Sequence, residues 1–275
     1  MDGILFIPPH HRRWHSYRLG INAVSFDNNY FFNDTRQAAT LHFHRIGSRR
    51  CISTDNHVNI EITNDGSPTL FVPELEEHYH STKGALTEAR HIFIENGLHH
   101  SKAEQPRVLE IGFGTGLNAF LTLLDAEQNH RHVHYTGIEL HPLHTDCLKQ
   151  LDYPSQICPE RSEDYYRMHT LPWETATQPT PYFELFKTEA DFTCWTPPHT
   201  FDVIYFDAFA PEKQPEMWTQ TLFDRLYKCL STNGILVTYC AKGVVRRMLQ
   251  TAGFHVERLP GPPNGKREIL RGTRH

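Results

Sequence analysis

The chain has 275 residues, of which 39% are hydrophobic and 12% aromatic. This composition supports a substantial core and excludes wholesale disorder. No apolar run approaches the roughly 18 residues that a membrane helix needs, and the first residues lack the flanks of a secretory signal. We therefore expect a cytoplasmic protein with reduced cysteines and no membrane partner. The net charge is −5, but residues 242–275 carry eight Lys/Arg against two Asp/Glu, either as a phosphate-facing patch or as an ordinary solvated surface.

The catalytic domain is expected to begin near residue 58. Residues 1–57 are rich in His, Arg and Asn and show no sustained helical or strand period, so we expect an N-terminal extension outside that domain, which spans residues 58–275. Runs at 58–63 and 69–73 flank an Asn-Asp-Gly sequence, which predicts a β-hairpin. Residues 84–96 then show apolar side chains near helical spacing before a glycine, which predicts a helix.

A glycine-rich turn follows the next predicted strand. Gly112, Gly114 and Gly116 let the backbone turn tightly and approach a ligand closely. Their spacing differs from the G-x-G-x-x-G of dinucleotide-binding folds, which disfavours a nicotinamide-dependent oxidoreductase. Glu110 at the entry would repel a pyrophosphate but suits a cationic sulfonium ligand and its ammonium group. S-adenosyl-L-methionine is therefore the expected cofactor.

Acidic residues end the two strands that come next in the chain. Glu139 is placed to accept hydrogen bonds from both ribose hydroxyls, as in nucleotide-binding α/β folds, unless it is only a surface residue at a strand end. Glu189 and Asp191 compete as the contact of the adenine amine, and the sequence does not separate them. The proline-rich residues 141–181 between these strands are predicted to form an insertion that covers the mouth of the active site.

A hydrophobic strand at 201–207 ends in Asp207, where open α/β sheets place ligand-binding residues. A carboxylate there can orient an amine and take its proton, while Phe209 and Trp218 shape a dry slot for the substrate. The alternatives are that Asp207 only caps a turn and that both aromatic residues belong to the core.

The whole pattern from residue 107 onward alternates strands and helices, which predicts a mostly parallel sheet covered on both faces. The last two strands are close in sequence, so we expect them to form an antiparallel hairpin at one edge. The predicted strands span 108–112, 133–140, 182–187, 201–207, 235–240, 255–259 and 267–272, and the predicted helices 117–127, 143–150, 215–230 and 243–252.

Three segments together, 110–118, 206–218 and 265–270, resemble the tRNA 5-methylaminomethyl-2-thiouridine methyltransferase family. This family comprises the methyltransferase half of bifunctional MnmC and its stand-alone relatives. The resemblance implies a Rossmann-like class I S-adenosylmethionine methyltransferase fold. It also implies methylation of the amine of 5-aminomethyl-(2-thio)uridine at the tRNA wobble position, with the anticodon loop as partner. No flavin-dependent oxidase half follows the last motif, so FAD is not expected.

The resemblance also assigns roles to individual residues. It places Asp207 at the reacting amine, with Phe209 and Trp218 on the substrate side. Lys266 and Arg267 either meet RNA phosphate, or Arg267 pairs with an acidic neighbour. The cofactor residues that it implies are Glu110, Gly112, Gly114, Gly116, Asn118 and Glu139.

Other functions stay open as alternatives. An aminopropyltransferase shares the glycine turn and the two strand-end carboxylates but needs a line of carboxylates for a polyamine; another small-amine methyltransferase is also compatible with the motifs. A catalytically silent RNA-binding module would keep the fold and lose cofactor affinity. The 20 histidines include alternating pairs, but no carboxylate or cysteine completes a ligand set, so no metal is expected. The sequence does not indicate an oligomeric state.

Overall fold

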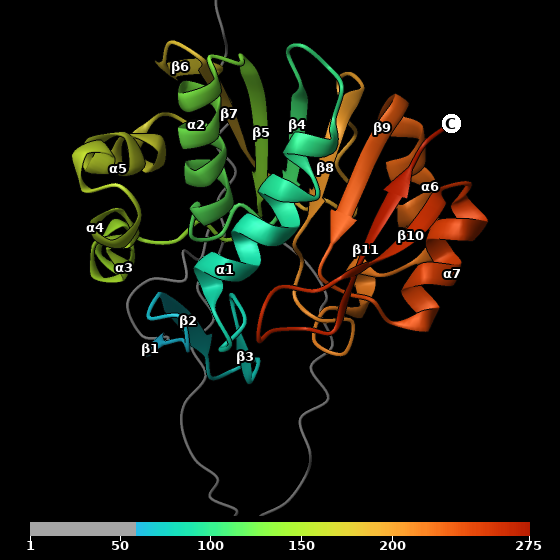
Figure 1. Cartoon of the computed structure of the whole chain (residues 1–275), viewed down its shortest axis with the longest axis horizontal. Coiled ribbons are helices and arrows are strands. Elements are labelled where there is room, and N and C mark those ends of the chain that lie inside the picture. Colours follow the sequence, from blue (N-terminus) through green and yellow to red (C-terminus); the bar gives the residue numbers. More distant parts are fainter. Residues whose placement is uncertain (1–58) are drawn as a thin grey trace, which may run out of the picture. The chain divides into compact units, whose positions relative to one another are not determined.

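Eight strands form the central sheet of the computed structural model, which describes residues 59–275 (Figure 1). Their bounds are β4 (Arg107–Ile111), β5 (Val133–Glu139), β6 (Thr177–Thr180), β7 (Phe183–Glu189), β8 (Phe201–Phe206), β9 (Leu230–Thr238), β10 (His255–Pro260) and β11 (Glu268–Thr273). The order across the sheet is β10-β11-β9-β8-β4-β5-β7-β6. Strands β7, β5, β4, β8 and β9 pair in parallel, whereas β11 pairs antiparallel with both β9 and β10. The predicted parallel sheet with a C-terminal antiparallel hairpin is confirmed.

Helices cover both faces of this sheet. One face packs against α1, which continues as the π-helical segment η1, and against α2, α4 and α5, while α6 and α7 cover the other face. The helical bounds are α1 (Ala85–Ala89), η1 (Arg90–Glu95), η2 (Leu98–His100), α2 (Leu117–Asn129), α3 (Thr145–Leu151), α4 (Tyr153–Ile157), η3 (Pro159–Arg161), α5 (Ser162–Thr170), η4 (Pro215–Met217), α6 (Gln220–Cys229) and α7 (Gly243–Ala252).

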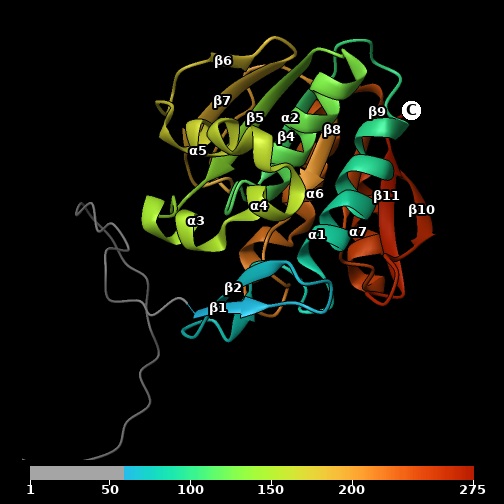
Figure 2. The ribbon, with the colours of Figure 1, turned by 60° about the vertical axis from the view of Figure 1, so that its left-hand side comes forward.

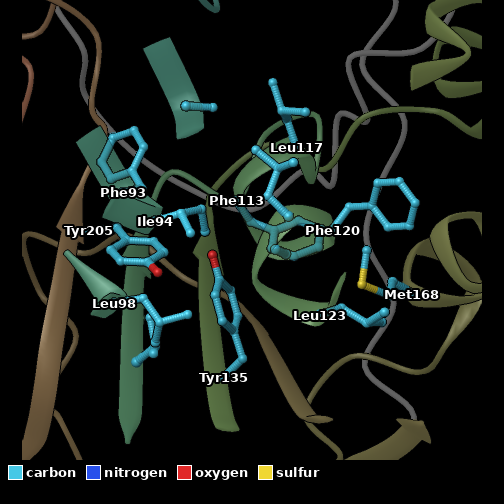
Figure 3. Close-up of a cluster of buried hydrophobic side chains, with 14 of the residues drawn as sticks. Phe93, Ile94, Leu98, Phe113, Leu117, Phe120, Leu123, Tyr135, Met168 and Tyr205 are labelled. Atoms are coloured by element: carbon cyan, nitrogen blue, oxygen red, sulfur yellow. The ribbon is translucent and has the colours of Figure 1, made fainter. Parts of the chain in front are cut away.

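The two hydrophobic layers follow from the alternation of side chains along each strand. In β4, Val108 packs into the layer under α2, and the next residue, Leu109, packs into the layer under α6. Both are fully buried, so the central strands read as continuous apolar runs, as expected for parallel strands covered twice. Figure 3 shows the first layer, where Phe93 of η1 packs on Tyr205 of β8 with ring centroids 5.1 Å apart.

A separate three-stranded sheet precedes α1 and lies at the end of the central sheet to which β9 points (Figures 1 and 2). It consists of β1 (Asn59–Ile62), β2 (Pro68–Val72) and β3 (Glu77–His78). The predicted hairpin is the antiparallel pair β1–β2. Its turn residue Asp65 accepts hydrogen bonds from the backbone N–H of Ser67 at 3.0 Å and of Thr87 in α1 at 2.8 Å. One carboxylate thus ties the hairpin to the first turn of α1.

Of the predicted N-terminal extension and the predicted insertion, the structure describes the insertion only. The extension predicted for residues 1–57 lies outside the described residues. Residues 141–181 form α3, α4, α5 and the edge strand β6, and the hydroxyl of Tyr165 in α5 donates to the backbone oxygen of Thr115 at 2.9 Å. In the range 59–275 no helix is long and apolar enough to span a bilayer.

Candidate active site

The glycine-rich turn links β4 to α2 through three residues with positive φ. Gly112, Gly114 and Gly116 have φ of 90°, 47° and 70°. A Cβ atom on Gly112 would lie 2.8 Å from the backbone oxygen of Asp207, and one on Gly116 would lie 2.6 Å from Nε2 of His169. Only glycine satisfies both the backbone conformation and the available space at these two positions.

Glu139 is fixed at the end of β5 by two backbone amides. The N–H of Gly114 donates to its Oε2 and the N–H of His141 donates to its Oε1, both at 2.9 Å. Burial raises the pKa of this carboxyl above its ordinary value, and the two amides act in the opposite direction. Each oxygen keeps an unused lone pair, so the carboxylate can still accept hydrogen bonds from a vicinal diol.

Asn118, in the first turn of α2, connects the two carboxylates that the sequence singles out. Its Nδ2 donates to Oε1 of Glu110 and to Oδ2 of Asp207, each at 2.9 Å. Asn118 is 2% exposed, and its Oδ1 has no hydrogen-bond partner among the described residues. A buried acceptor without a partner fits a ligand donor such as the ammonium group of S-adenosylmethionine.

Asp207 follows β8, and its backbone N–H donates to the oxygen of Ile111 at the end of β4, at 3.1 Å. This bond places the carboxyl group beside the glycine-rich turn. The pKa of Asp207 is raised to about 7, because burial and the negative charge of Glu88 raise it more than the Asn118 hydrogen bond and the Lys266 charge lower it. A carboxyl group with a pKa near 7 can accept and release a proton under neutral conditions.

Two cavities meet at the tip of β8 and share Ala208. The smaller, which we call the cofactor cavity, has a volume of about 110 Å³ and is lined by Gly112, Glu139 and Asp191 among others. Both Asp191 and Glu189 are exposed, but Asp191 lines this cavity and accepts from the N–H of Thr193 at 2.8 Å, whereas Glu189 does not line it. Of these two candidates, only Asp191 is therefore placed on the lining of the cofactor cavity.

The larger cavity, which we call the substrate cavity, has a volume of about 620 Å³ and contains the Asp207 position. Phe209 lines it and packs edge-to-face on Tyr79, with ring centroids 5.2 Å apart. Trp218 does not line it: this side chain is 5% exposed, and its Nε1 donates to the backbone oxygen of Phe209 at 2.8 Å. Trp218 thus acts behind the cavity wall, where it holds the Phe209 segment in place.

The two basic residues of the C-terminal motif have different surroundings. Lys266 forms an ion pair with the buried Glu88, at 2.5 Å, and lies 4.4 Å from the ring centroid of Tyr239. Arg267 is exposed at the rim of the substrate cavity and makes no ion pair within residues 59–275. Of the two phosphate candidates, only Arg267 has a side chain that is not already engaged.

Sequence reasoning missed three cavity residues, namely Tyr79, Glu88 and Tyr239. Tyr79 and Glu88 lie before and within α1, outside the three segments 110–118, 206–218 and 265–270 that carry the family resemblance. The insertion 141–181 lines neither cavity; instead α5 packs against the glycine-rich turn from its outer side. Within the described part of the chain, no group of three or more His, Cys, Asp or Glu could hold a metal ion.

Comparison with known proteins agrees with this architecture. A family model described as S-adenosyl-L-methionine-dependent methyltransferase matches residues 185–275. The bifunctional protein MnmC of Cupriavidus metallidurans, named for tRNA 5-methylaminomethyl-2-thiouridine biosynthesis, is 32% identical over 227 residues, which cover 76% of this chain and 32% of that protein. The MnmC protein of Magnetococcus marinus is 30% identical over 221 residues, with coverage of 74% and 32%. The chain thus spans about a third of the length of these relatives.

The crystal structure of MnmC2 from Aquifex aeolicus superposes with a TM-score of 0.63 at 24% identity, covering 80% of this chain and 71% of that one, and shows the shared fold. Fold and site together define a class I S-adenosylmethionine-dependent methyltransferase, in agreement with the cofactor predicted from the sequence. Within that class, the relatives to which the chain is similar are MnmC proteins, which it matches over about three quarters of its own length.

Proposed function

We propose that this chain transfers the methyl group of S-adenosylmethionine to the amine of 5-aminomethyl-uridine, with or without the 2-thio group, at the wobble position of tRNA. The observation that carries the proposal is the position of Asp207, at the tip of β8 where the cofactor cavity and the substrate cavity meet. The MnmC relatives, named for biosynthesis of the methylated product, support the choice of substrate. They give no support to the alternative of aminopropyl transfer to a polyamine.

The chemistry requires a neutral nitrogen in line with the methyl group. When bound, S-adenosylmethionine supplies a methyl carbon made electrophilic by the adjacent sulfonium. As a carboxylate, Asp207 would take one proton from the substrate ammonium and so free the nitrogen lone pair. Transfer of the methyl group to that nitrogen, with the electrons of the carbon–sulfur bond passing to sulfur, would leave a protonated secondary amine and a thioether. The protein's contribution is mainly positioning, which can supply roughly 7–11 kcal/mol.

Cofactor residues hold the two ends of that ligand in this proposal. Glu139 accepts from the ribose hydroxyls and Asp191 faces the adenine amine. Glu110 and the free Oδ1 of Asn118 face the ammonium group of the methionine moiety. The turn glycines allow the backbone to approach the ligand closely.

The substrate cavity suits a splayed-out base. Phe209 and Tyr79 offer aromatic surface for stacking, which is how proteins hold single-stranded RNA bases. Arg267 lies on the cavity lining and makes no ion pair within residues 59–275, so it is placed where backbone phosphates flanking the base would pass. The anticodon loop presents its bases unpaired, and an enzyme acting on it works in the cytoplasm.

Incubation with methyl-labelled cofactor and tRNA that carries 5-aminomethyl-uridine tests the proposal. Nucleoside mass spectrometry should show 5-methylaminomethyl-uridine, thiolated or not, and fully methylated tRNA serves as the matched negative substrate. Binding of the cofactor without methylation of this tRNA would overturn the substrate assignment. Absence of cofactor binding would instead indicate a silent module that retains the fold.

A further inference from the structure

Glu88 brings a second carboxylate into the substrate cavity. It belongs to α1, is 7% exposed, and lines the cavity together with Asp207. Its Oε2 accepts from Nζ of Lys266 at 2.5 Å, and its Oε1 is 3.4 Å from the backbone N–H of Ser81. Burial of an acidic side chain is costly unless its charge is compensated, so a carboxylate in this position needs an explanation.

The single positive charge of Lys266 does not balance the negative charges of both Glu88 and Asp207. Its ammonium group is bonded to Glu88 and lies over the ring of Tyr239, whose hydroxyl donates to the backbone oxygen of Ala208 at 2.9 Å. Glu88 and Asp207 interact unfavourably, since the charge of Glu88 raises the pKa of Asp207. This part of the cavity lining therefore contains two carboxyl groups and one lysine, so that one negative charge is left for an occupant to match when both carboxyl groups are ionised.

Aromatic side chains close this region on its other sides. Tyr79, Phe209 and Tyr239 line the same cavity and give it an aromatic wall beside the two carboxyl groups. Of the basic residues on the lining, Lys242 is paired with Glu212 and Arg267 is exposed at the rim. His80 is held neutral because burial lowers its pKa to about 4, and the other histidine on the lining, His78, already has a carboxylate partner, with its Nε2 2.9 Å from Oε2 of Glu61.

We infer that Glu88 is a second substrate carboxylate, which together with Asp207 binds the protonated primary amine of the incoming nucleotide. This inference rests on the proposed function and deepens it, because it makes the cavity selective for a cationic group in place of a neutral one of similar size. Lys266 holds the Glu88 carboxylate in place through their ion pair. After Asp207 has taken the proton, Glu88 continues to accept one N–H of the neutral amine and so orients the lone pair.

The decisive comparison uses Glu88→Gln, Lys266→Met and the double variant, each assayed for kcat and KM with aminomethyl tRNA. Glu88→Gln should lower kcat/KM by about 10- to 100-fold, the range for a lost hydrogen bond to a charged group. The double variant should stay equally low, since no amine contact is restored. Recovery of wild-type kcat/KM in the double variant would overturn the inference, because Glu88 would then serve only to neutralise Lys266.

A control comes from a second ion pair, in which the basic partner is the less exposed one. Arg271 and Glu257 are paired at 3.0 Å between β11 and β10, away from the cavity, so Glu257→Gln should leave kcat/KM within a few-fold of wild type. Cofactor affinity should be unchanged in all variants. If Glu88→Gln does not fold, the wild-type protein still provides a test with two nucleosides, 5-aminomethyl-uridine and 5-hydroxymethyl-uridine.

In that second test, the amine should bind to the wild-type protein at least about tenfold more tightly than the alcohol, since only the amine carries the missing charge. Equal affinity for both nucleosides would overturn the inference. Failure of the wild type to methylate tRNA would count against the proposed function, whereas a normal wild-type rate with an unaffected Glu88→Gln variant would count only against the role of Glu88.

Discussion

The side-chain amide of Asn118 donates a hydrogen bond to the carboxyl group of Asp207 at 2.9 Å, although the two residues are 89 positions apart. The same nitrogen donates to Glu110, so one asparagine spans the distance between the β4 and β8 ends. Both hydrogens of the amide are used, and the acceptor oxygen is left for a ligand. A change at Glu110 or Asn118, on the cofactor side, should therefore alter the surroundings of Asp207, which faces the substrate cavity.

Asp207→Asn should abolish most of the activity. The substitution keeps size and polarity but removes the group that takes the amine proton, so turnover should fall by a factor on the order of 10² or more. Cofactor affinity measured by calorimetry should stay within a few-fold, because Asp207 faces the substrate cavity. Full activity would remove Asp207 from the mechanism, and joint loss of activity and cofactor binding would make it a structural residue.

The pH dependence of the wild type follows from the same carboxyl group. Asp207 acts as a proton acceptor only when ionised, and its pKa is raised to about 7, so single-turnover rates should rise as pH increases through about 7. In Asp207→Asn this inflection should disappear, and raising the pH should partly rescue the variant because solvent then supplies the neutral amine. A wild-type profile that is flat between pH 6 and about 8 would contradict this assignment.

Asn118→Ala should move that inflection. The Asn118 hydrogen bond lowers the pKa of Asp207, so its removal raises the pKa, and the rise in rate should shift to higher pH by about one pH unit. Cofactor affinity should also fall, because Glu110 loses its donor. Asn129→Ala, at the exposed C-terminal end of the same helix, is the matched control, since its amide contacts only the backbone oxygen of Asp125. An unshifted profile in Asn118→Ala would show that the amide does not tune Asp207.

Cofactor affinity should depend on Glu139 and Asp191 but not on Glu189. Glu139→Ala removes the acceptor for two ribose hydroxyls and should weaken binding by roughly 1.5–3 kcal/mol. Asp191→Ala should also weaken binding, whereas Glu189→Ala makes the same charge change outside the cofactor cavity and should have little effect. Calorimetry should measure the cofactor affinity of the three variants. Equal losses of affinity in Asp191→Ala and Glu189→Ala would mean that other residues contact the adenine.

The sequence predicted those parts of the site that depend on local pattern. Gly112, Glu139 and Asp207 each end a hydrophobic strand, and parallel strands bring their carboxyl ends to one edge, so their proximity follows from the alternation of elements. The pairing of Lys266 with Glu88 was not predictable in this way, because 178 residues separate them and the contact depends on how the C-terminal hairpin packs beside α1.

Of the two alternatives predicted for Trp218, the substrate slot or the core, the structure agrees with the core. Its place in the motif suggested a wall of the substrate slot, but an indole that packs on Phe206 with centroids 4.9 Å apart and donates to Phe209 is buried by the fold of its own segment. Sequence patterns show that an aromatic residue is apolar but not whether it faces a cavity or the core. The edge strand β6 (Thr177–Thr180) was missed because it is short and contains Pro179, which is unfavourable within a sheet.

Gly116→Ala should destabilise the protein and weaken cofactor binding together. Gly116 precedes α2 with φ of 70°, a conformation that costs an alanine about 1–2 kcal/mol. The added Cβ would also lie 2.6 Å from Nε2 of His169, whose ring packs on Phe113 and Tyr165 and has little room to move. Urea denaturation should therefore show a loss larger than the backbone cost alone.

Two further variants separate the causes of that loss. His169→Ala in the Gly116→Ala background removes the clash but not the backbone strain, so it should restore only the part of stability above about 1–2 kcal/mol, measured against His169→Ala alone. Gly243→Ala is the matched control, because Gly243 begins α7 without a positive φ and its nearest neighbour is the flexible end of Arg247. Alanine is the better helix former there, so that variant should be neutral or slightly more stable. If Gly116→Ala were as stable as Gly243→Ala and kept full cofactor affinity, the turn would not need glycine at this position, and the close approach of α5 to it would have no functional consequence.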